Sequence, residues 1–373
     1  MIFLSHKKSL NCTIVASIGI SNIILDNSIK SKFEFPFKAL EWVQDQNLHL
    51  VTLPKLLGGK ELGISSGNTE LLTILKKVGN YNLSMGRIFE GHINALLLIE
   101  QFGNSLQKNS SYQEAKEGML FGIWNAELPF EPLKLDIKPN YFILNGAKFF
   151  CSGGSYIYRP IITASKPQGK QMIIAHLNKY NLKEDFSYWD PLGMEGSRSC
   201  RFDFTGIKIE TSQLLGNIDD YEKEPDFTGG AARFAAVQLG AVEGVIEDTI
   251  FHLTKNKRAR DPYQKHRIAK LQILRTRGNL WLERAGEITD QKNKDPEAYI
   301  NFSDLFRTEI RQTAQEVLNI CEYAIGLQSM MGDHPLQQKI RDLMVYLKQP
   351  GPDAALCRIG DRIIDNFENF ENR

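Results

Sequence analysis

The sequence predicts an α+β protein in which helical and β segments are grouped along the chain rather than alternated. Apolar residues recur at helical spacing up to about residue 118, short β-type runs separated by turn residues follow over 119–227, and helical spacing returns over 228–373. Grouped elements are typical of α+β folds, whereas strictly alternating ones indicate a parallel α/β sheet. We therefore expect three domains, over residues 1–118, 119–227 and 228–373.

The first region contains three helical patterns. Residues 36–51 carry apolar side chains at helical spacing, and a loop rich in Gly and Pro follows them. A second helix is expected to begin at Asn68, a residue type favoured as N-cap, with Glu70 in its first turn. The third pattern, residues 82–103, is mostly apolar and ends at Gly103.

The middle region reads as a series of short strands. In "YFILNGAKFFCSGG" the pair Asn145-Gly146 separates two apolar runs, and this is the strongest short-range signal for a β-hairpin. The runs "RPIITAS", "QMIIAHL" and "CRFDFTGIKI" continue the series, and Phe202, Phe204 and Ile207 in the last run alternate with polar residues. That alternation is typical of a half-buried strand.

The last region is helical again. "AARFAAVQLGAVEGVIEDTIFHL" is apolar on nearly all sides of its first half, which predicts a buried helix. Helices are expected over about 264–291 and 303–327, and a final pair flanks Pro350-Gly351-Pro352. This triplet marks a turn, because proline fixes φ and lacks an N–H.

Composition narrows the class of protein. The chain has 373 residues and a formal net charge of +1, with acidic and basic residues interleaved, so it gives no reason to propose a nucleic-acid partner. We interpret the first 20 residues as lacking a signal peptide, and no window resembles a membrane span. Five widely separated cysteines favour a reducing compartment, hence the cytoplasm, and argue against a structural zinc site. We name no metal-binding residues.

Common nucleotide and hydrolase motifs are missing: the sequence has no GxGxxG after a strand, no P-loop, no GxSxG and no HExxH. Three other stretches stand out: "WDPLGMEGSRSCRFDFTGIKI", "AKFFCSGGSYIYRPIITAS" and "HPLQQKIRDLMVYLKQPG". Together with "FPFKALEWVQDQNLHLVTLPKLLGG" and "LLGNIDDYEKEPDF" they resemble the acyl-CoA dehydrogenase family, in that family's order and spacing, over about residues 35–365.

The resemblance implies a fold and a cofactor. It implies an N-terminal helical domain, a middle antiparallel β-barrel and a C-terminal four-helix bundle, the same order as the periodicity predicts. It also implies FAD lying between barrel and bundle, and a homodimer or homotetramer. Flavin contacts carry over to Trp124, Asn125 and Ala126, to Phe150 stacking on the ring, to Ser152 near its edge, and to Arg258 or Arg260 at the pyrophosphate. Without the resemblance, Phe150 reads equally well as a barrel core residue.

The family's proton-abstracting glutamate has no counterpart at its usual places. Counted from Arg341-Asp342, its position is Pro350, which cannot accept a proton. A minority of the family places the base just before an arginine of the first bundle helix, where this chain has Ala232 before Arg233. We therefore expect a displaced or absent base.

The helix over residues 82–103 corresponds to the family's acyl-pocket helix and supplies other polar candidates. We expect Arg87, Glu90 and His92 to bind a small-molecule substrate, and Glu90 or His92 to act as proton acceptor. The alternatives are a hydrogen-bonded core histidine and a surface i,i+3 pair of Arg87 with Glu90. Arg198 and Arg233 are further substrate-binding candidates, and they read otherwise as a turn residue and an ion-pair partner.

Three functions follow from these residues. The first is a flavin-dependent oxidoreductase acting on an acyl thioester or a related small molecule. The second is a flavin-dependent oxidase or monooxygenase of the same fold, and the third is a catalytically degenerate binding subunit. Bound flavin separates the first two from the third, and rapid oxygen consumption separates the second from the first.

Overall fold

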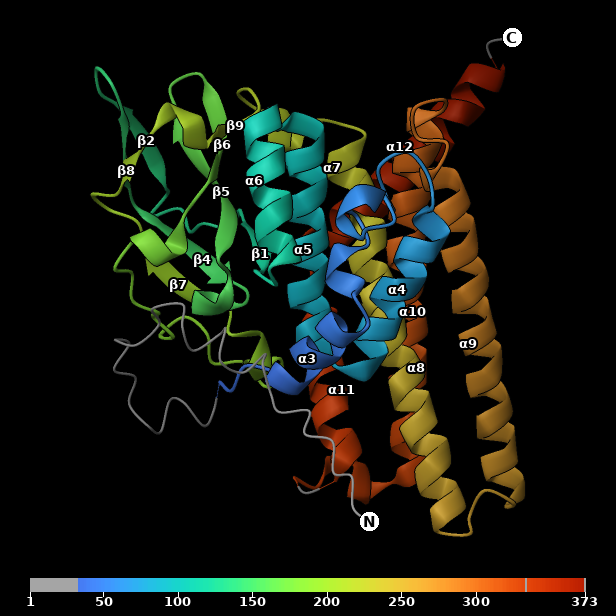
Figure 1. The fold of residues 1–373 in the computed structure, drawn as a ribbon. Helices are drawn as coiled ribbons and strands as arrows, with labels where there is room; N and C mark the ends of the chain where they lie inside the picture. Colours follow the sequence, from blue (N-terminus) through green and yellow to red (C-terminus); the bar gives the residue numbers. More distant parts are fainter. Residues whose placement is uncertain (1–32, 333, 372–373) are drawn as a thin grey trace, which may run out of the picture.

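The computed structural model describes residues 33–332 and 334–371. The helical, β and helical regions follow one another as the periodicity predicts, and the β-domain lies at one side of the molecule with the long helices of the bundle at the other (Figure 1). Cys12 lies outside the described residues, and so do the first 20 residues, in which we expect no signal peptide.

Over the described residues 33–118, the first region contains the helices α3 (Phe37–Asp45), α4 (Asn68–Tyr81), α5 (Leu83–Phe102) and α6 (Ser105–Lys116). The expected N-cap of α4 is wrong by one residue. Gly67, at φ +77°, is the N-cap, and Asn68 begins the helix while its side chain donates to Asp290 Oδ1 at 2.7 Å. Asn82 caps α5 by accepting from the backbone N of Met85 at 2.8 Å.

The middle region forms a curled β-domain. Its strands are β1 (Phe121–Trp124), β2 (Lys134–Ile137), β3 (Phe142–Asn145), β4 (Ala147–Cys151), β5 (Arg159–Lys166), β6 (Gly169–Ile174), β7 (Cys200–Asp203), β8 (Lys208–Ile209) and β9 (Leu214–Leu215). Within the described part of the chain, one seven-stranded sheet has the order β8-β3-β2-β5-β6-β9 with β1 beside β5, and β4 pairs with β7 apart from it. Most pairs are antiparallel as expected, but β1 and β2 both run parallel to β5.

The predicted hairpin at Asn145-Gly146 is wrong. The two runs are strands β3 and β4, yet β3 pairs with β2 and β8 while β4 pairs with β7. Gly146, at φ +115°, turns the chain from one sheet into the other, and a Cβ at this residue would lie 2.2 Å from the carbonyl oxygen of Pro132. The local turn signal is real, but tertiary packing assigns the two strands to different partners.

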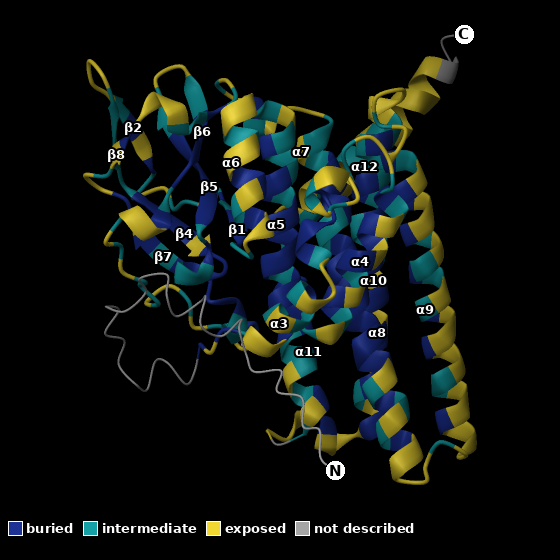
Figure 2. Ribbon diagram, viewed as in Figure 1, coloured by how far each residue is buried: buried dark blue, intermediate teal, exposed yellow. Residues whose placement is uncertain are grey.

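The last region contains α7 (Asp226–Gly229), α8 (Ala231–Lys255), α9 (Pro262–Thr289), α10 (Pro296–Ile325), α11 (Pro335–Tyr346) and α12 (Pro352–Glu371). The first half of α8 is buried as predicted, whereas α9 exposes its outer face (Figure 2). Proline begins α9, α10, α11 and α12, which is the helix position that tolerates its missing N–H.

Helix α5 lies between the β-domain and the rest of the bundle, in contact with β1 on one side and with α8 on the other (Figure 1). Polar residues on α5 therefore reach the junction of the two parts. No helix within the described residues is long and apolar enough to cross a membrane.

Candidate functional site

A cavity of about 1070 Å³ opens at this junction. It is bounded by α5, by the ends of β1 and β4, by the start of α8 and by the turn between α11 and α12. Apolar walls with a few converging polar groups are typical of small-molecule sites. Most of the predicted site residues line it: Arg87, Glu90, Trp124, Asn125, Ala126, Phe150, Ser152 and Arg233.

The β-domain wall combines aromatic and hydroxyl groups. Trp124 is buried and donates from Nε1 to the carbonyl oxygen of Ser152 at 3.1 Å, which ties the end of β1 to the end of β4. The hydroxyls of Ser152 and Ser199 lie 2.9 Å apart. Phe150 has a left-handed backbone at φ +53° and is 44% exposed, so its ring is not a core residue. Non-glycine residues in this conformation cluster at functional sites.

Trp189 belongs to the same wall and was not predicted. Its ring contacts that of Phe150 edge-on, with centroids 6.2 Å apart. Its Nε1 is buried without a hydrogen-bond partner among the described residues. Buried N–H groups almost always have a partner, so an unpaired Nε1 in a residue of the cavity wall is unusual. Trp189 belongs to one of the quoted motifs. Its place in the cavity wall could not be predicted, because it lies in an irregular loop without helical or strand periodicity.

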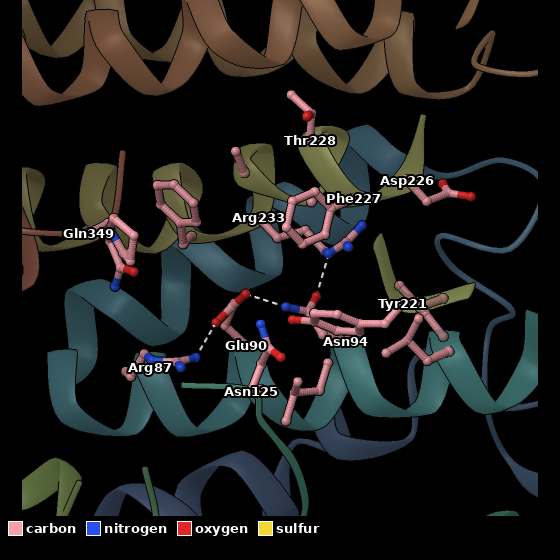
Figure 3. Close-up of a pocket in the computed structure, with 18 of the residues that line it drawn as sticks. Arg87, Glu90, Asn94, Asn125, Tyr221, Asp226, Phe227, Thr228, Arg233 and Gln349 are labelled. Carbon is pink, nitrogen blue, oxygen red and sulfur yellow. Dashed lines mark hydrogen bonds and ion pairs between the residues drawn. The ribbon is translucent and has the colours of Figure 1, made fainter. Parts of the chain in front are cut away.

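A chain of polar contacts runs across the bundle side of the cavity (Figure 3). Arg87 Nη1 lies 2.6 Å from Glu90 Oε2, Asn94 donates to the other oxygen of Glu90, and Arg233 Nε donates to Asn94 Oδ1. The spacing of residues 87, 90 and 94 places all three on one face of α5. Burial lowers the pKa of Arg87, but Glu90 together with Tyr346 and Tyr221 acts in the opposite sense, and the net effect is a raised pKa.

Two tyrosines complete this side. Burial, followed by the charge of Glu90, raises the pKa of Tyr221 to about 12. Burial likewise raises the pKa of Tyr346, whose hydroxyl has no hydrogen-bond partner within the described residues. Both phenols therefore stay neutral near pH 7 and can donate hydrogen bonds.

His92 does not lie in the cavity. It is fully buried, its Nε2 lies 2.9 Å from the carbonyl oxygen of His49, and its Nδ1 accepts from the backbone N of Phe121 at 3.1 Å. Burial lowers its pKa to about 4. Because both ring nitrogens are engaged with the backbone, the structure corresponds to the core alternative rather than to a proton acceptor.

Arg198 and Arg258 also lie away from the cavity. Arg198 is buried, pairs with Glu184 at 2.5 Å and lies over the ring of Phe186. Arg258 donates to the carbonyl oxygen of Ala324 at 3.3 Å, at the turn between α8 and α9. The prediction that Arg198 binds substrate is not supported by its position. Ser197 and Ser199 on either side of it line the cavity, but the side chain of Arg198 does not.

The turn at Pro350 forms part of the cavity wall, as does Gly351. Gly351 has φ +68°, which favours glycine, and Arg307 Nη2 donates to the carbonyl oxygen of Pro350 at 2.7 Å. Carboxylates do line the cavity elsewhere, at Glu90, Glu100, Asp220 and Asp226. Among the described residues no group of three or more His, Cys, Asp or Glu could hold a metal ion.

Known proteins resemble this chain both in sequence and in fold. The family model for the acyl-CoA dehydrogenase C-terminal domain matches residues 224–364. The solved structure of butyryl-CoA dehydrogenase from Megasphaera elsdenii superposes with a TM-score of 0.77 at 14% identity, covering 90% of this chain and 91% of that one. Residues 224–364 are thus similar to the C-terminal domain of acyl-CoA dehydrogenases, and the chain as a whole shares their fold.

The proteins that match this chain in sequence are distant from it. Mitochondrial isovaleryl-CoA dehydrogenase of Pongo abelii is 25% identical over 250 residues, 61% of this chain and 56% of that protein. The 3-sulfinopropanoyl-CoA desulfinase of Variovorax paradoxus is 22% identical over 339 residues, 84% of this chain and 82% of that protein. The chain spans about half the length of the first curated relatives it matches. FMN-bound TdsC from Paenibacillus sp. A11-2 shares the fold, with a TM-score of 0.80, 15% identity and coverage of 91% and 93% of the two chains.

Proposed function

We propose that this chain is a flavin-dependent oxidoreductase that binds FAD and acts on an acyl thioester or a related small molecule. The observation that carries the proposal is the β-domain wall of the cavity, where Phe150 and Trp189 present aromatic surface beside hydroxyl groups. The names of two relatives, isovaleryl-CoA dehydrogenase and 3-sulfinopropanoyl-CoA desulfinase, both denote acyl-CoA substrates and support the substrate class.

The residues of this wall fit a flavin. A large planar ring with hydrogen-bond acceptors along its edge needs aromatic surface to pack on and N–H or O–H donors beside it. Phe150 supplies exposed aromatic surface, and the Ser152–Ser199 hydroxyl pair supplies O–H donors. The strand end at Trp124, Asn125 and Ala126 contributes backbone groups to the same wall. FAD, when bound, supplies a two-electron acceptor for a C–H bond of the substrate.

The polar chain on α5 is assigned to the substrate. Arg87 and Arg233 bring two guanidinium groups to the cavity, and Glu90 and Asn94 lie between them. Both oxygens of Glu90 already accept hydrogen bonds, so we assign Glu90 to orienting Arg87 and Asn94 rather than to taking a proton. With proline at position 350, the base of the reaction is displaced or absent.

The absorption spectrum of the purified protein, with the released cofactor identified, tests this function. We expect flavin bands near one FAD per chain. Phe150→Ala should weaken FAD binding at least about tenfold, because stacking on an aromatic ring contributes about 1 kcal/mol or more. Phe251→Ala removes an exposed phenylalanine of α8 that does not line the cavity and should leave FAD affinity unchanged.

Two outcomes of that experiment would contradict the proposal. A colourless protein that FAD cannot reconstitute would exclude an enzyme of this kind and leave a binding subunit. Rapid oxygen consumption by the reduced flavoprotein would replace the dehydrogenase reaction with that of an oxidase or monooxygenase.

We also infer a cytoplasmic homodimer or homotetramer. Four cysteines in the described part of the chain, Cys151, Cys200, Cys321 and Cys357, are free thiols, which fits a reducing compartment. Light scattering of the purified protein tests the assembly, and a monomer at micromolar concentration would contradict it.

A further inference from the structure

A cluster of arginines surrounds one carboxylate at the end of the cavity nearest Pro350. Asp304, on α10, is fully buried and accepts two hydrogen bonds from Arg358, at 2.9 and 2.6 Å. It accepts a third from Arg362 at 3.1 Å. Both oxygens of Asp304 are thus occupied by guanidinium groups of α12.

Arg307 lies one turn further along α10 and has no such partner. No carboxylate oxygen of the described residues lies within 4.0 Å of its guanidinium nitrogens. Its Nη2 donates to the carbonyl oxygen of Pro350 at 2.7 Å, and its guanidinium carbon lies 4.9 Å from the ring centre of Phe234. The carbonyl and the ring orient the guanidinium group at the cavity wall.

Burial and neighbouring charge make this arrangement unfavourable without an anion. Burial lowers the pKa of Arg307, and the positive charges of Arg358 and Arg311 lower it further, while Asp304 acts in the opposite sense. Charges taken out of water are normally paired. Asp304 is the nearby carboxylate that acts on Arg307, but Arg358 and Arg362 already occupy both of its oxygens, so it does not bind Arg307 directly.

The cavity as a whole carries more basic than acidic side chains. Seven basic residues line it against four acidic ones, and because Arg358 is paired with the buried Asp304 behind it, the formal excess is two positive charges; the basic ones are Arg87, Lys223, Arg233, Lys292, Arg307, Lys348 and Arg358. Of the acidic residues, Asp226 is already paired with Lys292 at 2.5 Å and Glu90 with Arg87 at 2.6 Å. The potential in the cavity therefore favours an anion.

We propose that Arg307, with Arg358 beside it, forms an anion subsite at the Pro350 end of the cavity, which binds an oxyanion carried by the substrate. The chemistry that fits is a carboxylate or a phosphate, since either accepts two parallel N–H bonds from one guanidinium group. That the bound anion is part of the substrate rests on the proposed function. The subsite itself rests on the contacts of Arg307.

Calorimetric titration of the FAD-saturated full chain with inorganic phosphate, and separately with butyrate, tests the subsite. We expect at least one of the two anions to bind, and the choice between them tells which group the substrate carries. Arg307→Gln should weaken that binding at least about tenfold, as loss of a charge-assisted hydrogen bond does. Arg311→Gln removes the same charge one turn away on α10, outside the cavity, and should change affinity less than twofold.

The subsite is overturned if neither anion binds, or if the two glutamine variants lose affinity equally. Should Arg307→Gln not fold, Arg307→Lys keeps the charge but loses the planar fork, and unchanged affinity in that variant would also overturn the subsite. FAD content is read separately from its absorbance. A chain that binds phosphate or butyrate through Arg307 but takes up no FAD would refute the proposed function and leave the subsite standing.

Discussion

Asp342 Oδ1 accepts a hydrogen bond from the backbone N of Met194 at 2.5 Å. Together with a hydrogen bond from Gln338 to Glu195, this contact ties the loop that carries Trp189 and Ser199 to α11, the helix that leads into the Pro350 turn. Gly193 lies so close to the same helix that a Cβ there would be 2.4 Å from the carbonyl carbon of Arg341. Two walls of the cavity are therefore held together at Asp342.

Asp342→Ala should destabilise the protein by about 1–3 kcal/mol, because it leaves the Met194 N–H without its acceptor. Asp342→Asn keeps an acceptor oxygen and removes a carboxylate whose pKa is raised by burial, so its cost should be smaller. Urea unfolding at pH 7 measures both. The exposed Asp361→Ala on α12 is the control, and an equal loss in all three variants would contradict the role of this contact.

Stability should fall as pH decreases from about 6.5 to about 4. Burial lowers the pKa of His92 and of His49 to about 4, below the ordinary value of 6.5. In this interval the unfolded chain binds protons that the folded chain excludes, so the free energy of unfolding decreases by up to about 1.4 kcal/mol per pH unit for each histidine. Urea unfolding at pH 7, 6 and 5 measures the slope.

His92→Gln can keep a donor and an acceptor for the His49 carbonyl and the Phe121 N–H but cannot titrate. This variant should lose about one histidine's contribution to the pH dependence of the free energy of unfolding. His266→Gln, at an exposed position of α9, should leave the slope as it is. A His92→Gln slope identical to that of the wild type would refute the assignment of His92 as a buried neutral histidine.

The order of the elements could be predicted from the sequence because periodicity is a local property. The buried first half of α8 and the extent of α5 followed from apolar spacing, and the end of α5 followed from Gly103. Strand partners could not be predicted in this way. Asn145-Gly146 is a strong local turn signal, but the choice between β2, β7 and β8 as partners depends on residues far along the chain.

The site residues on regular helices could be predicted from the sequence, and those in irregular loops could not. Arg87 and Glu90 could be predicted, since three residues of α-helix bring them onto one face, and Arg233 follows from the resemblance of its helix. Arg198 was expected in the cavity because its neighbours face it, yet Arg198 has φ +46° and its side chain points to Glu184. The direction of a side chain in an irregular loop depends on tertiary contacts, as the unpredicted role of Trp189 also shows.

Lys148 should be among the most sensitive positions of the β-domain. It is fully buried, and its Nζ donates to Asn125 O at 3.0 Å, to Glu127 Oε1 at 3.1 Å and to Thr163 Oγ1 at 3.0 Å. Burial lowers its pKa. Lys148→Met leaves these acceptors unpaired, and we expect a loss of roughly 3 kcal/mol in the free energy of unfolding.

Lys148 also supports the strand end that lines the cavity, so Lys148→Met should weaken FAD binding in addition. The exposed Lys134→Met on β2 is the matched control and should be nearly neutral in urea unfolding and in FAD titration. If Lys148→Met unfolds at the same urea concentration as the wild type, the three hydrogen bonds of Lys148 do not stabilise the fold.

Pro350→Glu should compete with the anion subsite from within the chain. Residue 350 lines the cavity and its carbonyl oxygen already contacts Arg307, so a carboxylate introduced there can pair directly with Arg307. We expect the affinity for phosphate or butyrate, whichever the wild type binds, to fall at least about tenfold in calorimetric titration. Pro350→Ala removes the proline without adding charge and should stay within twofold of the wild type. Equal affinities in the two variants would show that the Pro350 turn and Arg307 do not share a ligand.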